Sequence, residues 1–206
     1  MSGTAGGHGR RAVPGTDGGP GSGTLGDMVD DTGIPRTGAD AAGADGGGAA
    51  PGRPLTIAFV CTGNICRSPM AASVFTEHLR ATGLDDGVEI VSAGLGSWHV
   101  GERADPRARA TLTEHGYPDD HIAAQVGARH LDADLLLAAD GGHLDELRAL
   151  AGPDADVRLL RSFDPTAPPD AEIPDPYYGA GDGFTDVLGM IERSVAGLLD
   201  WVRENR

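Results

Sequence analysis

The sequence contains no lysine, so all 16 of its basic side chains are arginines. A Walker-type nucleotide loop requires lysine, and its absence therefore excludes that kind of site. Asp and Glu number 31 and outweigh the arginines, which gives a formal net charge of −15 at pH 7. An acidic chain without basic clusters is a poor partner for nucleic acid or for an anionic membrane surface. We therefore expect no nucleic-acid partner.

Cysteines and long apolar runs are also scarce. Cys61 and Cys66 are the only two cysteines, too few for a disulfide scaffold. The spacing of cysteines and histidines fits no zinc motif, so we expect no metal and no cofactor. No apolar run reaches the length of about 18 residues that a membrane helix needs, and the N-terminus lacks a signal-peptide core. We expect a reduced, cytoplasmic protein without membrane insertion; export without a signal peptide stays open.

The first 53 residues differ in composition from the rest of the chain. They hold 17 of the 33 glycines and no aromatic residue. Such a segment cannot bury enough apolar surface to offset chain entropy, so we predict that residues 1–53 form a disordered Gly-rich extension. A G-x-G-x-x-G match at residues 21–26 follows no strand pattern and is expected to be chance. Whether the extension is functional or results from an upstream start codon stays open.

Residues 54–206 carry the patterns of a folded domain. Short apolar runs predict strands over residues 55–60, 88–91, 135–138 and 157–160. Helical periodicity predicts helices over residues 69–81, 106–115, 142–150 and 187–202. Alternating strands and helices predict an α/β fold with three layers, in which helices flank both faces of a four-stranded parallel sheet, as in flavodoxin-like proteins. Ligands bind such sheets at the carboxyl ends of the strands.

The most informative motif follows the first predicted strand. Cys61 ends the strand, five loop residues follow, and Arg67 leads into a helical pattern. A loop that closes on a helix start directs backbone N–H groups and the positive helix end toward an anion. The Arg67 guanidinium can hold two phosphate oxygens, and the positive surroundings favour the thiolate of Cys61. A buried strand with an inert cysteine is the alternative, but the combined spacing favours a phosphatase site.

Phosphate-ester cleavage also needs a proton for the leaving oxygen, which a carboxylic acid can supply. Asp-Pro pairs occur at Asp105, Asp164 and Asp175. A simple turn explains each pair equally well. The residues alone therefore do not identify the acid.

The motif resembles the signature of the low-molecular-weight protein tyrosine phosphatases. The likeness covers about residues 54–206 and includes Val60–Ala71, Ser92–Gly94, Trp98–Gly101, His115–Tyr117 and Asp175–Gly179. It implies hydrolysis of protein phosphotyrosine through a cysteinyl-phosphate intermediate. Cys61 would be the nucleophile, Arg67 the phosphate clamp and Asp175 the general acid and base.

The resemblance also implies roles for further residues. The phosphate-binding loop would consist of Cys61, Thr62, Gly63, Asn64, Ile65, Cys66, Arg67 and Ser68. Ser68 would donate a hydrogen bond to the thiolate, and Asn64 would hold a left-handed loop backbone, since Asn tolerates that conformation. Ser92 and His121 would support Asn64. An ordinary role for His121 stays open, because Ala123-Ala124-Gln125 follows it where relatives commonly carry an arginine.

Three aromatic residues would form the substrate slot. In the family, residues at the positions of Trp98, Tyr177 and Tyr178 wall a deep pocket that favours phosphotyrosine over the shorter phosphoserine. Ordinary packing is the alternative, and phosphorylation of the tyrosine pair, known in some relatives, stays open. Asp140 is expected to be a helix N-cap. Cys66 is either a small core residue or a disulfide partner for oxidised Cys61.

Other functions share parts of this pattern. Arsenate reductases need cysteines outside the loop, which this chain lacks. Protein arginine phosphatases typically carry threonine where this chain has Ile65, and a non-catalytic phosphopeptide-binding module would lack Cys61, Arg67 or Asp175. The expected partner is a phosphotyrosine-containing protein, with a bacterial tyrosine kinase as one candidate.

Overall fold

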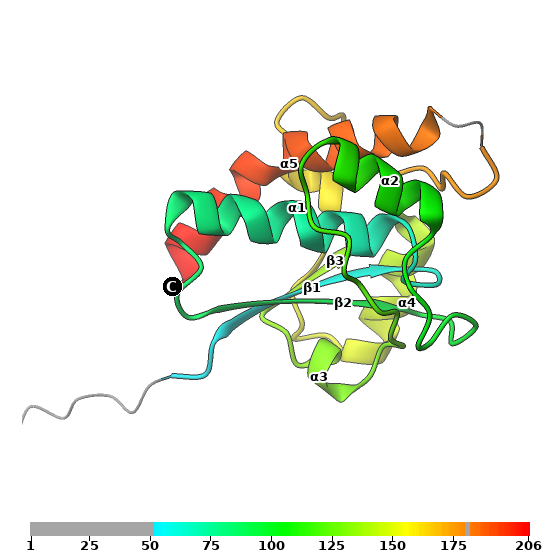
Figure 1. Ribbon diagram of the computed structural model, residues 1–206. Coiled ribbons are helices and arrows are strands. Elements are labelled where there is room, and N and C mark those ends of the chain that lie inside the picture. The colour runs from blue at the N-terminus through cyan, green and yellow to red at the C-terminus, as the bar shows by residue number, and fades with distance from the viewer. Residues whose placement is uncertain (1–51, 180–181) are drawn as a thin grey trace, which may run out of the picture. The chain divides into compact units, whose positions relative to one another are not determined.

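The computed structural model describes residues 52–179 and 182–206 (Figure 1). The strands are β1 Leu55–Cys61, β2 Val88–Gly94, β3 Leu135–Ala138 and β4 Val157–Leu159. The helices are α1 Arg67–Thr82, α2 Pro106–Glu114, α3 Ala128–Leu131, α4 Gly141–Ala151, the 3₁₀ helix η1 Leu160–Phe163 and α5 Gly183–Asn205. The predicted strands and helices are confirmed. The short α3 and η1 were not expected, because four residues carry no helical period. All but the last two residues of the predicted extension lie outside the described residues.

The four strands form one parallel sheet in the order β2-β1-β3-β4. Cys61 at the end of β1 lies opposite Gly94 of β2, and Val60 lies opposite Ala138 of β3. The carboxyl ends of these three strands therefore meet at one edge of the sheet. In parallel α/β sheets this edge is where ligands bind. The predicted fold class is confirmed.

Helices cover both faces of the sheet. Ile57 and Phe59 of β1 pack with α1, α2 and α5 on one face. The intervening residues Ala58 and Val60 pack with Leu147 of α4 on the other. Figure 1 shows α1 and α5 on one side of the strands and α3 on the opposite side. Burial on both faces explains why the strands are almost continuously apolar rather than alternating.

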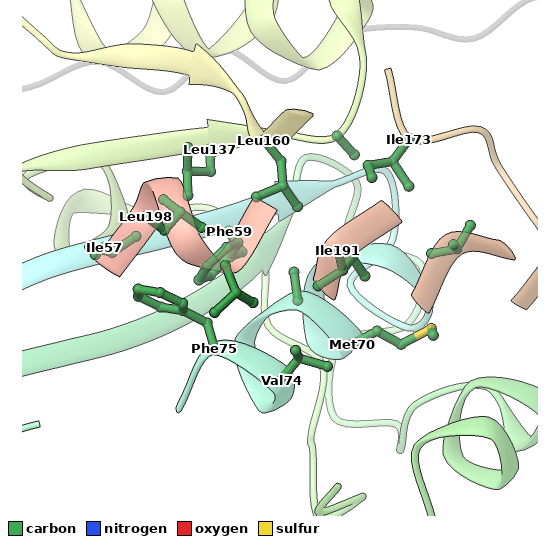
Figure 2. Packing of buried hydrophobic residues seen from close by; sticks show 14 of the residues in the cluster. Ile57, Phe59, Met70, Val74, Phe75, Leu137, Leu160, Ile173, Ile191 and Leu198 are labelled. Atoms are coloured by element: carbon green, nitrogen blue, oxygen red, sulfur yellow. The ribbon is translucent and has the colours of Figure 1, made fainter. Parts of the chain in front are cut away.

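The sheet and α1 pack together through a buried hydrophobic core (Figure 2). Phe59 and Phe75 meet edge to face with their ring centroids 6.0 Å apart. The predicted inward residues of α1 are buried, namely Met70, Val74, Phe75 and Leu79. Cys61 and Cys66 belong to the same buried cluster. Both cysteines of the loop are thus fixed in a close-packed interior of low compressibility.

The helix α1 begins at Arg67, two residues before the predicted start. Pro69 therefore lies inside the first turn, where its missing N–H removes no helical hydrogen bond. The helix ends at Thr82 and is capped by Gly83, whose φ of 67° is the left-handed conformation that glycine adopts readily. None of the helices in residues 52–179 and 182–206 is both long and apolar enough to cross a membrane.

Candidate active site

A pocket of about 350 Å³ opens at the carboxyl end of β1. Its lining residues come from the loop, from the segment after β2 and from the segment before α5: Cys61, Thr62, Gly63, Ile65, Cys66, Arg67, Trp98, His99, Asp175, Tyr177 and Tyr178. The structure thus brings the three residues predicted for catalysis into one pocket with the three predicted aromatic residues. Asn64 and Ser68 of the loop lie outside the lining, as do Ser92 and His121, which contact Asn64.

The Cys61 thiol is buried beside a chain of hydrogen-bonding side chains. Its Sγ atom lies 2.9 Å from Ser68 Oγ. Asn64 Nδ2 donates to the same Ser68 oxygen at 2.9 Å. The hydroxyl hydrogen of Ser68 has two acceptors within reach, the Cys61 sulfur at 2.9 Å and the Ala93 carbonyl oxygen at 3.3 Å. A hydrogen bond to the charged form stabilises a thiolate at this position.

Asn64 holds the middle of the loop in an uncommon backbone conformation. Its φ is 57°, in the left-handed region. The side-chain amide donates to Ser92 Oγ at 3.0 Å and accepts from the Ala124 backbone N–H at 2.8 Å. His121 Nε2 lies 2.9 Å from the Asn64 backbone oxygen and 3.1 Å from Oδ1. Both oxygens only accept hydrogen bonds, so Nε2 carries the hydrogen. Ser92 and His121 therefore both contact Asn64.

The segment after β2 lies directly against the loop backbone. A Cβ atom on Gly94 would lie only 2.8 Å from the Gly63 carbonyl carbon, closer than real Cβ contacts. The Gly96 N–H donates to the Thr62 carbonyl oxygen at 2.8 Å. Only glycine at position 94 permits this approach. The close contact explains why Gly94 belongs to the motif Ser92-Ala93-Gly94.

Arg67 is buried, and its guanidinium is held by four partners. Nη1 donates to Asp140 Oδ2 at 2.8 Å and to the Ile173 carbonyl oxygen at 3.2 Å. Nη2 donates to Thr62 Oγ1 at 3.1 Å and to Asp175 Oδ2 at 3.2 Å. These contacts fix the plane of the guanidinium within the pocket that also contains Cys61. An arginine fixed in this way is suited to hold phosphate oxygens.

Asp140 serves two purposes, one of which was predicted. Its side chain accepts the His143 backbone N–H at 3.0 Å, so the predicted N-cap of α4 is confirmed. The same carboxylate also binds Arg67, a contact that the sequence did not indicate. Burial opposes ionisation of Asp140, but the His143 N–H and the Arg67 guanidinium outweigh it and hold the pKa below its ordinary value. The carboxylate is therefore charged at neutral pH.

The geometry distinguishes the three Asp-Pro aspartates. Asp105 is buried and caps α2 by accepting the Arg107 backbone N–H at 2.8 Å. Asp164 is buried and pairs with Arg193 at 3.3 Å. Asp175 alone of the three lines the pocket, with 40% of its side chain exposed. Its position allows proton transfer to a ligand in the pocket.

The aromatic residues at the pocket mouth are exposed rather than packed. Trp98 is 72% exposed and Tyr178 is 91% exposed, whereas Tyr177 is 40% exposed. The rings of Tyr177 and Tyr178 meet nearly at right angles, with centroids 4.9 Å apart. Ordinary core packing does not explain such exposure. Exposed rings around a pocket offer apolar contact area to an aromatic ligand.

Cys66 is a buried neighbour of the nucleophile candidate. The structure describes both cysteines as free thiols. Burial, followed by the negative charge of Asp105, raises the pKa of Cys66 to about 12. A thiol of this kind stays protonated and unreactive at neutral pH. The core interpretation of Cys66 has direct support, and the redox role stays a prediction.

Sequence reasoning missed three residues around the pocket. His99 lines it, and His143 lies 2.9 Å from Thr62 Oγ1. Arg107 donates to the Tyr177 carbonyl oxygen at 3.1 Å and stacks over the Tyr177 ring. None of these residues stands at a spacing that marks a site. Only the first, next to Trp98 in the family-like segment, carried a usable signal.

Comparison with known proteins agrees with this geometry. The family model described as low molecular weight phosphotyrosine protein phosphatase matches residues 56–206. Low molecular weight protein-tyrosine phosphatase A of Mycobacterium tuberculosis H37Rv is 55% identical over 73% of this chain and 93% of that protein. The low molecular weight protein-tyrosine-phosphatase of Streptomyces coelicolor is 52% identical over 72% of this chain and 93% of that protein.

Solved structures give the same picture. A protein tyrosine phosphatase from Entamoeba histolytica is similar with a TM-score of 0.68 and 30% identity, over 73% of this chain and 98% of that one. A Drosophila arginine phosphatase has a TM-score of 0.65 and 32% identity, over 70% of this chain and 95% of that one. The chain belongs to the low molecular weight phosphotyrosine protein phosphatase family and is an enzyme of that family.

Proposed function

We propose that the protein hydrolyses phosphotyrosine monoesters in proteins through a cysteinyl-phosphate intermediate. The observation that supports this most directly is the meeting of Cys61, Arg67 and Asp175 in one pocket rimmed by aromatic rings. A nucleophile, a phosphate clamp and an acid are the three groups that the reaction needs. The proposed partner is a phosphotyrosine-containing protein, and a bacterial tyrosine kinase is a candidate.

In the first step, Arg67 and the loop N–H groups hold the phosphoryl oxygens of the substrate. The Cys61 thiolate attacks phosphorus, and the bond from phosphorus to the phenolic oxygen breaks. Asp175 donates its proton to that oxygen, so tyrosine leaves uncharged. The preorganised positive groups stabilise the charge on the phosphoryl group in the transition state.

In the second step, the ionised Asp175 accepts a proton from a water molecule. The oxygen of that water attacks phosphorus, and the bond between sulfur and phosphorus breaks. Inorganic phosphate leaves, and the thiolate of Cys61 is restored. The Ser68 hydroxyl, 2.9 Å from the sulfur, stabilises the thiolate as it reforms.

The preference for phosphotyrosine is inferred from the aromatic residues that line the pocket. Trp98 and Tyr178 expose their rings beside Asp175, a surface suited to a phenyl ring. Phosphoarginine is the second candidate substrate, because an arginine phosphatase of known structure shares the fold. Against it, the pocket is lined by the apolar Ile65 at the position where protein arginine phosphatases typically carry threonine.

The decisive assay compares three peptides that differ only in the modified residue: phosphotyrosine, phosphoarginine and phosphoserine. In EDTA, we expect turnover of the phosphotyrosine peptide and of p-nitrophenyl phosphate, with much slower turnover of the other two peptides. Cys61→Ser should abolish turnover while still binding vanadate. A higher kcat/KM for phosphoarginine would replace the proposed substrate, and an absence of all turnover would end the proposal.

A further inference from the structure

A buried histidine lies behind the phosphate-binding loop and has no part in the steps above. His143 stands in the first turn of α4, with 8% of its side chain exposed. Its Nε2 atom lies 2.9 Å from Thr62 Oγ1. Its Nδ1 atom lies 2.8 Å from Asp140 Oδ1. The imidazole therefore joins the first loop residue after Cys61 to the start of α4.

Arg67 closes these contacts into a ring of four side chains. Its Nη1 donates to Asp140 Oδ2 at 2.8 Å, and its Nη2 donates to Thr62 Oγ1 at 3.1 Å. Each member of the ring thus touches two others. His143 is the one member that neither caps a helix with its side chain nor lines the pocket that contains Cys61. The polar contacts of its side chain are those with Thr62 and Asp140.

The contacts select one tautomer of His143. Thr62 Oγ1 accepts a hydrogen from Arg67, so its own hydroxyl hydrogen is available for the neighbouring Nε2 atom. An accepting Nε2 carries no hydrogen, which places the ring hydrogen on Nδ1, facing the Asp140 carboxylate. The Nδ1 atom has no well-angled hydrogen bond, so this second link is electrostatic.

The charges around the ring favour the neutral form. Burial lowers the pKa of His143 most strongly; Asp140 opposes this, Arg67 adds to it, and Asp175 and Glu146 oppose it. The net effect is a pKa below the ordinary histidine value. At neutral pH the imidazole therefore accepts the Thr62 hydrogen instead of donating a second one.

We propose that His143, as the neutral Nδ1–H tautomer, is a positioning residue that fixes Thr62 and the Arg67 guanidinium for phosphate binding. This inference rests on the proposed function, since it concerns the same pocket. Without the imidazole, Thr62 loses its acceptor and Asp140 loses one of its neighbours. Arg67 then keeps its charge but loses part of its orientation, which weakens its hold on phosphate.

Substitutions of His143 and of Thr62 measure how much their contact contributes to phosphate binding. His143→Leu keeps much of the volume, and we expect it to raise Ki for inorganic phosphate and lower kcat/KM for p-nitrophenyl phosphate, each by about 3- to 10-fold. His143→Gln can return an acceptor to Thr62 and should recover most of the loss. Thr62→Val should match His143→Leu, and the double variant should be no worse than either, because both remove one contact.

The matched control is His130, a second buried histidine whose pKa is lowered by burial. Its Nδ1 accepts the Gly127 N–H at 3.2 Å, in the short helix α3 and away from the loop. His130→Leu should reduce stability but leave Ki for phosphate and kcat/KM unchanged. An effect on Ki as large as that of His143→Leu would show a general loss of packing and overturn the proposal.

The tautomer gives a test without turnover. In the wild-type protein, ¹⁵N NMR of the histidine side chains should show His143 as Nδ1–H at neutral pH, with a shift when inorganic phosphate is titrated. An Nε2–H tautomer, or a folded His143→Leu variant with unchanged Ki, would overturn the proposal. If the protein failed only to hydrolyse the phosphotyrosine peptide, the His143 tautomer and Ki for inorganic phosphate could still be measured. The proposed substrate and the proposed role of His143 can therefore be contradicted independently.

Discussion

At the residue scale, the site depends on two neighbours of one sulfur atom. Ser68 lies 2.9 Å from Cys61 Sγ and can donate a hydrogen bond to it. Arg67 lines the same pocket, and its guanidinium pairs with the half-buried Asp140 and the exposed Asp175. The proposed acid, Asp175, lies on a separate segment, where its Oδ1 accepts the Tyr177 N–H at 3.1 Å. Each chemical role thus belongs to a single side chain.

Asp175→Asn tests the acid role. The amide keeps the shape of the carboxylate but cannot donate a proton to the leaving oxygen at a useful rate. We expect kcat/KM, which reports the first step, to fall by about 10²- to 10⁴-fold for phenyl phosphate, whose phenolate is a poor leaving group. The loss should be much smaller for p-nitrophenyl phosphate, whose phenolate leaves without help. Equal losses of kcat/KM for both esters would remove Asp175 from the acid role.

At the element scale, Arg107 of α2 connects the segment that carries Asp175 and Tyr177 to the rest of the fold. Its guanidinium pairs with Asp105 at 2.8 Å and donates to the Tyr177 carbonyl oxygen at 3.1 Å. It also lies over the rings of Tyr177 and Phe184, 5.4 and 4.8 Å from their centroids. Two segments about 70 residues apart are thus joined by one side chain.

Arg107→Lys tests this connection. Lysine keeps the charge beside Asp105 but lacks the planar fork that bonds and stacks at once. We expect kcat/KM for a phosphotyrosine peptide to fall by about 3- to 10-fold, because the acid-bearing segment loses a hydrogen bond and a stacking contact. Ki for inorganic phosphate should stay the same, since the side-chain hydrogen bonds that the structure gives Arg107 go to Asp105 and Tyr177 and not to the loop. A rise in Ki would show that Arg107 acts on the loop instead.

Local patterns predicted most of the fold, and the motif from Cys61 to Arg67 predicted the centre of the site. Both depend on neighbours in sequence. The contacts that orient Arg67 do not: Asp140 is 73 positions away, and His143 is 81 positions from its partner Thr62. Choosing Asp175 among three Asp-Pro pairs required the family resemblance, because nothing local separates them. Long-range side-chain contacts are fixed only when the sheet assembles.

At the scale of the whole molecule, buried histidines make stability depend on pH. Burial lowers the pKa of His121, His130 and His143. The folded state therefore binds fewer protons than the unfolded state, in which histidine has a pKa of about 6.5. The stability that neutral histidines contribute is complete above that pH and is lost as the pH falls below it.

The corresponding measurement is urea unfolding between about pH 7 and about pH 5, a range above the ordinary carboxyl pKa values. We expect the free energy of unfolding to decrease steadily on acidification. His130→Leu, which removes one of the three groups, should make the decrease shallower. A free energy that does not change with pH over this range would contradict the assigned pKa directions.

The proposed domain boundary predicts that the N-terminal residues are dispensable for catalysis. A truncated protein that begins at Gly52 keeps Arg53, which pairs with Asp134 at the start of the folded part. An exposed pair of this kind contributes at most about 1 kcal/mol. We expect kcat/KM for p-nitrophenyl phosphate to equal that of the full chain. A loss beyond a few-fold would show that residues 1–51 take part in the reaction.

The central claim is that Cys61 carries the phosphoryl group between the two steps. Rapid acid quenching of Asp175→Asn during turnover of p-nitrophenyl phosphate, followed by peptide mass spectrometry, tests this directly. We predict a phosphorylated peptide whose modification lies on Cys61 and disappears in Cys61→Ser. A burst of nitrophenol without any phosphorylated Cys61, or a phosphoryl group on another residue, would contradict the mechanism.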